Sequence, residues 1–382
     1  MTTPGATEPR DATMASESPA KEASVPCRAG ACEAGEREAG ACEARGREAG
    51  VARRAPLVVG SDCSGMCTEA HALDALGVPH EHAFCSETWE PAIRCIRAMA
   101  KRPKVIYRDC TERDAASAPQ VDLYVCGFPC QPNSVMNVKR TEGSDARRDP
   151  MRVALDYIQT KRPKYWVLEN VTGLLHVGKG AVWRALVDAL DALDGYAWDY
   201  RILDPCKHAG SPQSRPRVYL CGRRDCAGPL EWPDEVPLSA RCVDLLDAGA
   251  AGGTPAAPCY LKMLDTWGIG KDLPGVVEFC AASRAYSPYK KGEPLAPLTP
   301  DERKHVLKAD IAPCLIKHDP GPYANHLGRY LTADECLKLQ GFEPARVRRP
   351  QVTPLQMRQL TGNAMHCGVL AEVLAALLDE SE

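Results

Sequence analysis

One cysteine of this chain stands where a catalytic nucleophile would be expected. It is Cys130, in the segment Gly-Phe-Pro-Cys-Gln at residues 127–131. The apolar run Leu123–Cys126 before it is too short for a helix and predicts a strand, which Gly127 and Pro129 end. The thiol is therefore expected on a loop beyond a strand's carboxyl end, where open α/β sheets keep their active sites.

Only the thiolate form of a cysteine attacks well, so a catalytic Cys130 needs a positive environment. The loop that follows it contains four cations that could supply one: Lys139, Arg140, Arg147 and Arg148. The alternative is a small buried thiol, which is what most cysteines are, and the chain has 19 of them. A turn next to Pro129 is a poor place to bury a side chain, but these residues alone support the two interpretations equally.

The segments around Cys130 alternate between strand and helix patterns. Strands are expected at 57–59, 82–85, 105–107, 123–126, 165–168, 198–203 and 218–222. Helices are expected at 68–76, 91–100, 151–160, 182–193 and 357–378. This order is typical of an α/β fold with a doubly wound, Rossmann-like sheet.

The first turn and the second strand indicate a cofactor site. Residues 62–66 form a small-residue turn between the first strand and the first helix, which lets backbone approach a ligand. Glu87 closes the second strand, where a carboxylate can accept hydrogen bonds from both ribose hydroxyls. The turn has one glycine, Gly65, which is a weak signal for a dinucleotide. Trp89 could cover an adenine face, although a core tryptophan is equally well supported.

Five short motifs occur in order along the chain. Each motif alone is weak, whereas five in this order and spacing form a strong signal. Together they resemble the DNA (cytosine-5) methyltransferase family, from about residue 56 to the C-terminus with a gap near 225–325. The motifs are Gly-Phe-Pro-Cys-Gln at 127–131, Glu-Asn-Val at 169–171, Gln-x-Arg-x-Arg at 213–217, Leu-Thr-x-x-Glu-x-x-x-Leu-Gln-Gly-Phe at 331–342 and Gly-Asn-Ala at 362–364.

The resemblance implies a reaction for Cys130. Its thiolate would add to carbon 6 of a flipped cytosine, and a donor at ring nitrogen 3 would stabilise the charge that builds on the ring. Glu169, expected at the carboxyl end of the strand 165–168, is the candidate donor; a glutamate that caps the next helix is the alternative. By resemblance Arg217 reaches cytosine O2 and Arg215 steadies the catalytic loop, with two solvated strand arginines as the alternative.

The resemblance also implies S-adenosyl-L-methionine as cofactor, which suits a turn with one glycine because it has no pyrophosphate. Asp109 matches the family acid that hydrogen-bonds the adenine amino group, with a solvated loop aspartate as the alternative. The family pattern Phe-x-Gly-x-Gly-Gly is replaced here by Cys-Ser-Gly-Met-Cys-Thr at 63–68, so fewer contacts are expected from this turn. The expected cofactor residues are Ser64, Gly65, Glu87, Trp89, Asp109, Cys110, Pro129, Asn363 and Ala364.

Four regions are expected along the chain. Residues 1–55 are poor in large apolar side chains and contain a near-duplicated segment, so they predict a disordered tail, with a docking or targeting arm as the alternative. Residues 56–224 form the first part of the catalytic domain. By resemblance, 225–328 is a small irregular target recognition domain, and 329–382 contains a hinge motif and a terminal helix that completes the cofactor pocket.

Two segments are candidates for contact with nucleic acid. By resemblance, the long polar loop after Cys130 closes over DNA, and its cations would meet phosphates. Within 225–328 a basic and aromatic cluster could meet a backbone, although a solvated loop is an equally supported interpretation. The cluster consists of Arg284, Tyr286, Tyr289, Lys290 and Lys291.

Composition narrows the class of protein. No run of 18 apolar residues and no signal peptide is present in the 382 residues, so neither a membrane span nor secretion is expected. Nineteen cysteines without a Cys-x-x-Cys pair favour reduced thiols in an intracellular protein, and no metal site is expected. The net charge of −3 does not indicate nucleic-acid binding, but a local basic cleft is sufficient for it.

The sequence therefore predicts a monomeric DNA (cytosine-5) methyltransferase that acts by base flipping and a covalent cysteine adduct. It would work in the nucleus of a eukaryote, or in the cytoplasm for a prokaryotic or viral protein. The rival within the same fold is methylation of a structured RNA such as transfer RNA. From another class, the rival is a catalytically silent DNA-binding homologue, which would have no reason to keep Cys130, Glu169, Arg215 and Arg217 together.

Overall fold

The structure, a computed structural model, describes residues 55–129, 149–225, 228–250, 253–279, 296–317 and 321–379. The expected nucleophile Cys130 and the polar loop after it lie outside the described residues, as do the basic and aromatic cluster and all but the last residue of the predicted tail.

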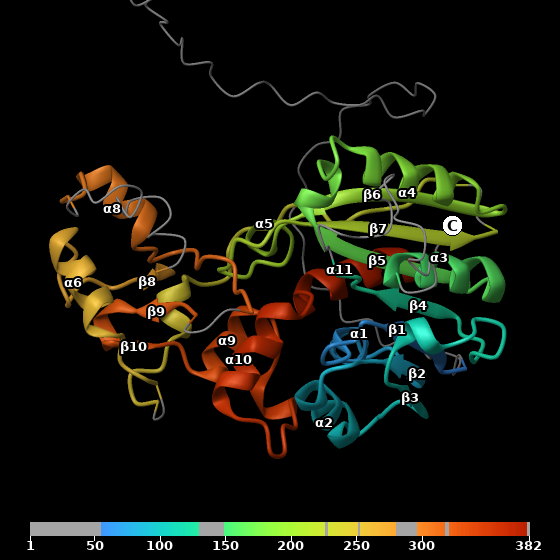
Figure 1. The fold of residues 1–382 in the computed structure, drawn as a ribbon, viewed down its shortest axis with the longest axis horizontal. Helices are drawn as coiled ribbons and strands as arrows, with labels where there is room; N and C mark the ends of the chain where they lie inside the picture. Colours follow the sequence, from blue (N-terminus) through green and yellow to red (C-terminus); the bar gives the residue numbers. More distant parts are fainter. Residues whose placement is uncertain are drawn as a thin grey trace, which may run out of the picture. The chain divides into compact units, whose positions relative to one another are not determined.

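A seven-stranded sheet forms the centre of the catalytic part, in the order β3-β2-β1-β4-β5-β7-β6 (Figure 1). β1 pairs in parallel with β2 and β4, whereas β7 runs antiparallel to β5 and β6. The chain changes its winding direction between β1 and β4, which is where doubly wound sheets bind ligands. The strands are β1 Leu57–Asp62, β2 His80–Ser86, β3 Val105–Tyr107, β4 Leu123–Cys126, β5 Tyr165–Val171, β6 Tyr196–Leu203 and β7 Arg217–Arg224.

Helices cover both faces of this sheet because its central strands are apolar on both sides. Along β4, Leu123 and Val125 face one helical layer, and Tyr124 and Cys126 face the other. The first layer consists of α1 Thr68–Ala75, α2 Glu90–Ala98, α10 Pro354–Asn363 and α11 Cys367–Leu378. The second layer consists of α3 Pro150–Lys161 and α4 Ala181–Asp191. The predicted doubly wound α/β fold is confirmed.

Two predicted elements differ in detail. Glu169 and Asn170 were expected just after a strand, but β5 continues through Val171 because its pairing with β7 extends as far as Arg217. The terminal helix, expected as one element over 357–378, is two helices separated by residues 364–366. The second helix has its own N-cap, since Nδ1 of His366 accepts a hydrogen bond from the backbone N–H of Val369 at 3.2 Å.

The last two helices form a stretch, residues 354–378, that is long and apolar enough to cross a membrane by length and composition alone. An 18-residue window within it has a mean hydropathy of 1.3. However, 72% of its apolar window is buried inside the protein. α11 packs against α1 and shares its core with Val59 of β1, so core packing accounts for this composition.

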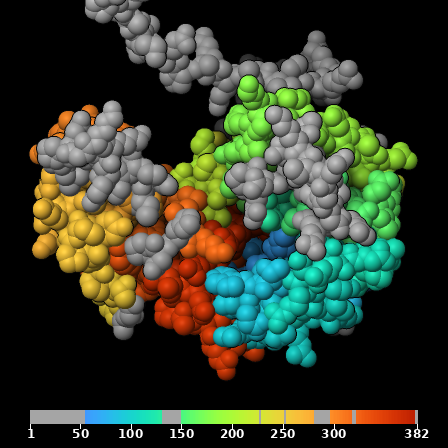
Figure 2. Space-filling model, in the orientation of Figure 1, coloured from blue at the N-terminus to red at the C-terminus, as the bar shows by residue number. Residues whose placement is uncertain are grey.

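A second, smaller core lies in the region after β7. Its three-stranded sheet has the order β10-β9-β8, with β8 Val276–Val277, β9 Tyr323–Ala324 and β10 Arg329–Tyr330. α6 Pro258–Thr266 and α8 Pro300–Val306 contribute to a core around the buried Trp267 and Phe279. The space-filling view shows these segments in yellow and orange (Figure 2). β10 lies past residue 328, so both sides of the expected domain boundary contribute to this sheet.

Short elements complete the described chain. The remaining helices are α5 Pro205–His208 and α9 Ala333–Leu339. The 3-10 turns are η1 Cys110–Glu112, η3 Thr172–Leu175, η4 Cys242–Leu245, η5 Asn325–Leu327 and η6 Pro344–Arg346.

Candidate active site

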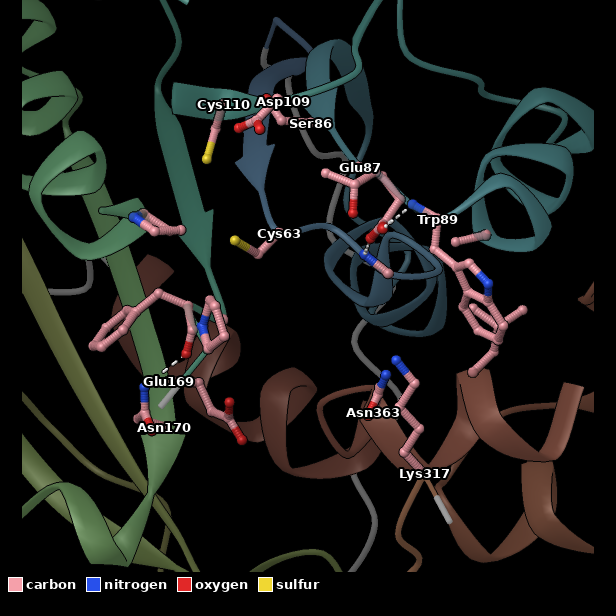
Figure 3. A pocket seen from close by; sticks show the side chains of 18 of the residues that line it. Cys63, Ser86, Glu87, Trp89, Asp109, Cys110, Glu169, Asn170, Lys317 and Asn363 are labelled. Carbon is pink, nitrogen blue, oxygen red and sulfur yellow. Dashed lines mark hydrogen bonds between the residues drawn. The ribbon is translucent and has the colours of Figure 1, made fainter. Parts of the chain in front are cut away.

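A cavity of about 1120 Å³ opens at the carboxyl ends of the central strands (Figure 3). This volume is sufficient for a nucleotide-sized cofactor together with one base. Side chains from α10 and from the segment that ends at Lys317 line the side opposite the strands. The predicted site residues that line the cavity are Gly65, Glu87, Trp89, Asp109, Cys110, Pro129, Glu169, Arg215, Arg217 and Asn363.

Glu87 follows directly after β2, and its carboxylate is held by two backbone donors. Oε2 accepts a hydrogen bond from the N–H of Gly65 at 2.8 Å, and Oε1 accepts one from the N–H of Trp89 at 2.8 Å. Gly65 has a φ of 55°, a conformation that favours glycine. Each carboxylate oxygen has a second lone pair, so Glu87 can accept further hydrogen bonds from a ligand in the cavity.

Asp109 is oriented in a similar way at the start of η1. Its Oδ1 accepts hydrogen bonds from both the backbone N–H and the hydroxyl of Thr111, each at 2.8 Å. These two bonds fix the side chain as an N-cap and leave acceptor capacity on the carboxylate. Asp109 and Glu87 thus provide two oriented carboxylates in the same cavity.

Lys317 is a cavity residue that sequence reasoning missed. Its Nζ lies 5.3 Å from the centre of the Trp89 ring, a cation–π contact between segments far apart in the sequence. In Figure 3 Lys317 lies beside Asn363, on the side of the cavity away from Glu169. No pattern around Lys317 indicates this position, because the fold alone brings residue 317 to residue 89.

Glu169 is buried at the opposite end of the cavity. Its Oε1 lies 3.4 Å from Nε of Arg217, and both side chains are only slightly exposed. Burial raises the pKa of the Glu169 carboxyl above its usual value of 4.5, while the positive charges of Arg217 and Arg215 oppose that rise. A carboxyl in this environment can hold a proton at a higher pH than a solvated glutamate can.

Asn170 connects β5 to the start of the Cys130 loop. Its Nδ2 donates a hydrogen bond to the carbonyl oxygen of Phe128 at 2.7 Å, and its Oδ1 accepts one from the N–H of Val171 at 2.8 Å. Pro129, the last described residue before Cys130, lines the cavity. The loop that contains Cys130 therefore leaves β4 at the edge of the cavity.

Arg215 joins three segments beneath the cavity. Its guanidinium donates hydrogen bonds to the carbonyls of Leu315 at 2.7 Å, Gly362 at 3.0 Å and Ala364 at 2.9 Å. Gly362 is required by close packing, since a Cβ there would lie 2.5 Å from the carbonyl of Ile316. Arg215 thus holds the Gly-Asn-Ala segment in place beside the cavity wall.

Two predicted cofactor residues do not line the cavity. The hydroxyl of Ser64 accepts hydrogen bonds from the Ser61 hydroxyl at 2.7 Å and from the Ser86 N–H at 3.2 Å, so it ties β1 to β2. The carbonyl of Ala364 accepts from Gln340 and Arg215. Both residues lie next in sequence to a cavity residue, Gly65 or Asn363.

A buried network at the end of β1 was also missed by sequence reasoning. Asp62 accepts hydrogen bonds from the Tyr124 hydroxyl at 2.7 Å, from the hydroxyl of Ser86 and from the guanidinium of Arg113. The Arg113 guanidinium also lies 4.6 Å from the centre of the Phe84 ring. These contacts link the ends of β1, β2 and β4, where the cavity opens.

The sheet is doubly wound and Rossmann-like, and the cavity lies at the carboxyl ends of its central strands. The structure resembles the crystal structure of the S. pombe Dnmt2 methyltransferase with a TM-score of 0.55 and 19% sequence identity, covering 85% of this chain and 98% of that one. It resembles Spodoptera frugiperda DNMT2 with a TM-score of 0.56 and 15% identity. At these sequence identities the similarity is evidence for the fold alone.

Residues 62–236 match the family of C-5 cytosine-specific DNA methylases. The chain is 35% identical over 140 residues to the type II methyltransferase M.BsuFI of Bacillus subtilis, covering 35% of this chain and 33% of that protein. It is 25% identical over 287 residues to M.Bsp6I of Bacillus sp. (strain RFL6), covering 71% of this chain and 82% of that protein. The similarity to C-5 cytosine-specific DNA methylases therefore lies in residues 62–236, the segment that provides most of the residues lining the cavity.

The matched segment spans about a third of the length of the first two curated relatives. The match to this family implies S-adenosyl-L-methionine as the cofactor. The oriented carboxylates of Glu87 and Asp109 fit such a ligand, because its ribose hydroxyls and its adenine amino group are all hydrogen-bond donors.

Proposed function

We propose that this protein transfers a methyl group from S-adenosyl-L-methionine to carbon 5 of cytosine in DNA. The observation that carries the proposal is a single cavity with two chemically different ends. One end has the acceptor carboxylates of Glu87 and Asp109, and the other has the buried Glu169 beside Arg217.

At the cofactor end, each group has a partner on S-adenosyl-L-methionine. Glu87 accepts from the ribose hydroxyls, and Asp109 accepts from the adenine amino group. The ammonium of Lys317 is placed to bind the carboxylate of the methionine part, since it lines the same cavity from the α10 side. When bound, the cofactor supplies an electrophilic methyl group.

At the base end, the residues match the needs of a flipped cytosine. The thiolate of Cys130 adds to carbon 6, and Glu169 in its protonated form donates to ring nitrogen 3 as negative charge develops there. Arg217 donates to O2 of the base and keeps Glu169 oriented from 3.4 Å. Arg215, with its guanidinium bound to three carbonyls, positions the surrounding segments instead of contacting the base.

We propose that residues 225–328 select the target sequence in DNA. The described part of this region has its own small core. A DNA methyltransferase must reach its DNA, so we place this protein in the cytoplasm of a prokaryotic or virus-infected cell, or in the nucleus of a eukaryote. We expect a monomer, because a single chain contains both ends of the cavity.

The decisive experiment is a covalent trap combined with sequencing. Purified protein is incubated with S-adenosyl-L-methionine and mixed-sequence duplex DNA, and the product is analysed by bisulfite sequencing. In parallel, DNA of the same sequences with 5-fluorocytosine is tested for an adduct that survives denaturant, because elimination requires loss of the substituent at carbon 5.

We expect methylated cytosines within one sequence context and an adduct whose peptide contains Cys130. An identical pair of reactions with transfer RNA tests the rival substrate. Methylation of RNA alone would overturn the DNA assignment, and cofactor binding without methylation of either nucleic acid would identify a silent homologue.

A further inference from the structure

Three buried side chains outside the cavity have the chemistry of metal ligands. They are Cys67, Glu69 and His82, which are 0%, 1% and 2% exposed. One ligand atom from each lies within 4.8 Å of the others. None of the three lines the proposed active-site cavity.

Local backbone features bring these side chains together. Cys67 is the N-cap of α1 and has a φ of 53°, and Glu69 lies in the first turn of the same helix. The pairing of β1 with β2 shifts register between Val59 and Gly60, so Val59 pairs with His82 whereas Ser61 pairs with Cys85. This bulge turns His82 and Cys85, three residues apart, toward the same face of the sheet.

Hydrogen bonds satisfy this cluster only in part. Nε2 of His82 lies 3.5 Å from the Ser61 hydroxyl. Within the described residues, Oε1 of Glu69 and Nδ1 of His82 are buried without a hydrogen-bond partner. Oε1 of Glu69 and Nε2 of His82 lie 3.4 Å apart and form no hydrogen bond. Two nitrogen or oxygen ligands of one tetrahedral zinc ion, each about 2.0–2.1 Å from the metal, lie about 3.3 Å apart.

Burial also works against the charged forms of both groups. A divalent cation would offset the cost of burying the charged Glu69 carboxylate. Neutral imidazole is the form of histidine that binds metal. A thiolate and a carboxylate would together neutralise the two positive charges of the ion.

We propose that Cys67, Glu69 and His82 bind one zinc ion. The candidate for the fourth ligand is Cys85, which packs with Cys67 in one buried cluster but does not belong to the group of ligand atoms within 4.8 Å of one another. Thiolate, imidazole and carboxylate are the three ligand types that zinc takes in proteins, and complete burial is typical of a structural site that is closed to substrate.

The ion would stabilise the turn that faces the cofactor cavity. Gly65, two residues before Cys67, donates its N–H to Glu87 in the cavity wall. A metal bridge between the start of α1 and β2 would fix this turn, whose backbone includes two non-glycine residues with positive φ, Cys63 and Cys67. No ligand belongs to the proposed catalytic groups, so metal content can be measured separately from methyl transfer.

The first test measures the metal content of the full-length protein. Wild type and variants are purified in zinc-containing medium, desalted and analysed by mass spectrometry of the elements. Glu69→Gln and Cys67→Ser remove one ligand each, and Cys221→Ser is the matched control, because Cys221 is a buried thiol of β7. We expect roughly one zinc ion per chain in wild type and control, and an at least tenfold lower content in both ligand variants.

The second test uses only the wild-type chain, so it does not depend on the folding of a variant. The metal is removed with a chelator, and Zn²⁺ or Co²⁺ alone is added back. We expect a higher melting temperature with either ion and a thiolate-to-cobalt absorption band. Wild type without zinc after purification, together with no thermal shift on Zn²⁺ addition, would overturn the site. Equal zinc in wild type and both ligand variants would do so as well.

Discussion

Oε1 of Glu169 lies 3.4 Å from Nε of Arg217, on neighbouring antiparallel strands. Glu169 pairs with Tyr219, and Arg217 pairs with Val171, so the two side chains meet diagonally across β5 and β7. The pKa of Glu169 is raised despite this partner because burial outweighs the attraction of Arg217. The pair therefore places a guanidinium beside a carboxyl that holds its proton to a higher pH than a solvated glutamate does.

The raised pKa predicts a specific pH profile. The protonated carboxyl persists above its usual pKa of 4.5 and is lost as the pH rises through the raised value. If the proton at Glu169 assists methylation, the single-turnover rate should fall with rising pH over that range. Gln cannot titrate, so the rate of Glu169→Gln should not fall with rising pH over this range. That rate should also be about 10²- to 10³-fold lower than that of wild type. If the rate of Glu169→Gln still falls with rising pH, the titration belongs to another group.

Cys130→Ser should abolish methyl transfer and leave cofactor binding intact. An alkoxide is not available near neutral pH, so covalent addition to the base should slow by orders of magnitude. The chain offers a matched control in Cys259→Ser, because Cys259 is an exposed thiol of α6. The test measures the methylation rate of both variants and their cofactor affinity by calorimetry. If Cys130→Ser keeps most of its activity, this thiol is not part of the mechanism.

Glu87→Ala should weaken binding of S-adenosyl-L-methionine and leave DNA affinity nearly unchanged. The loss of a charge-assisted acceptor costs about 1.5–3 kcal/mol, which corresponds to roughly 10- to 150-fold in affinity. The control is Glu90→Ala, which removes an exposed carboxylate that pairs with Arg108 on the same segment. Calorimetry with both ligands checks this, and an unchanged cofactor dissociation constant in Glu87→Ala would mean that the ribose lies elsewhere.

Lys317→Gln should discriminate between two related ligands. The ammonium is exposed at the cavity, so its loss should weaken binding of S-adenosylhomocysteine by only about three- to tenfold. Binding of 5′-methylthioadenosine, which lacks the amino acid part, should not change. Lys317→Arg should restore most of the affinity. If both ligands weaken equally, Lys317 acts through Trp89 and not through the carboxylate.

Arg215→Met should destabilise the protein far more than Arg217→Met. Removal of the Arg215 guanidinium leaves the carbonyls of Leu315, Gly362 and Ala364 without these donors, at a cost of at least about 3 kcal/mol. Urea unfolding measures the difference, with Arg201→Met of β6 as an exposed control expected within about 0.5 kcal/mol of wild type. Equal stabilities of the Arg215 and Arg217 variants would contradict the bracing role of Arg215.

The sequence by itself determined the fold class and identified ten of the residues that line the cavity. Strands such as Leu123–Cys126 are detectable because burial on both faces leaves a continuous apolar run, which is a local property of the chain. Glu87 was found because the ends of parallel strands are where ligands bind, and strand ends can be predicted from local pattern. Asp109 was found by its resemblance to the family acid at the corresponding position.

Tertiary structure alone decided which distant residues share the site. Lys317 lies over Trp89, and Arg215 binds the carbonyls of the Gly-Asn-Ala segment, although no local pattern links these positions. The cluster of Cys67, Glu69 and His82 depends on a register shift between β1 and β2. The physical reason is that periodicity reports which face of a segment is buried, whereas the partner of that face depends on packing between segments that are remote in the sequence.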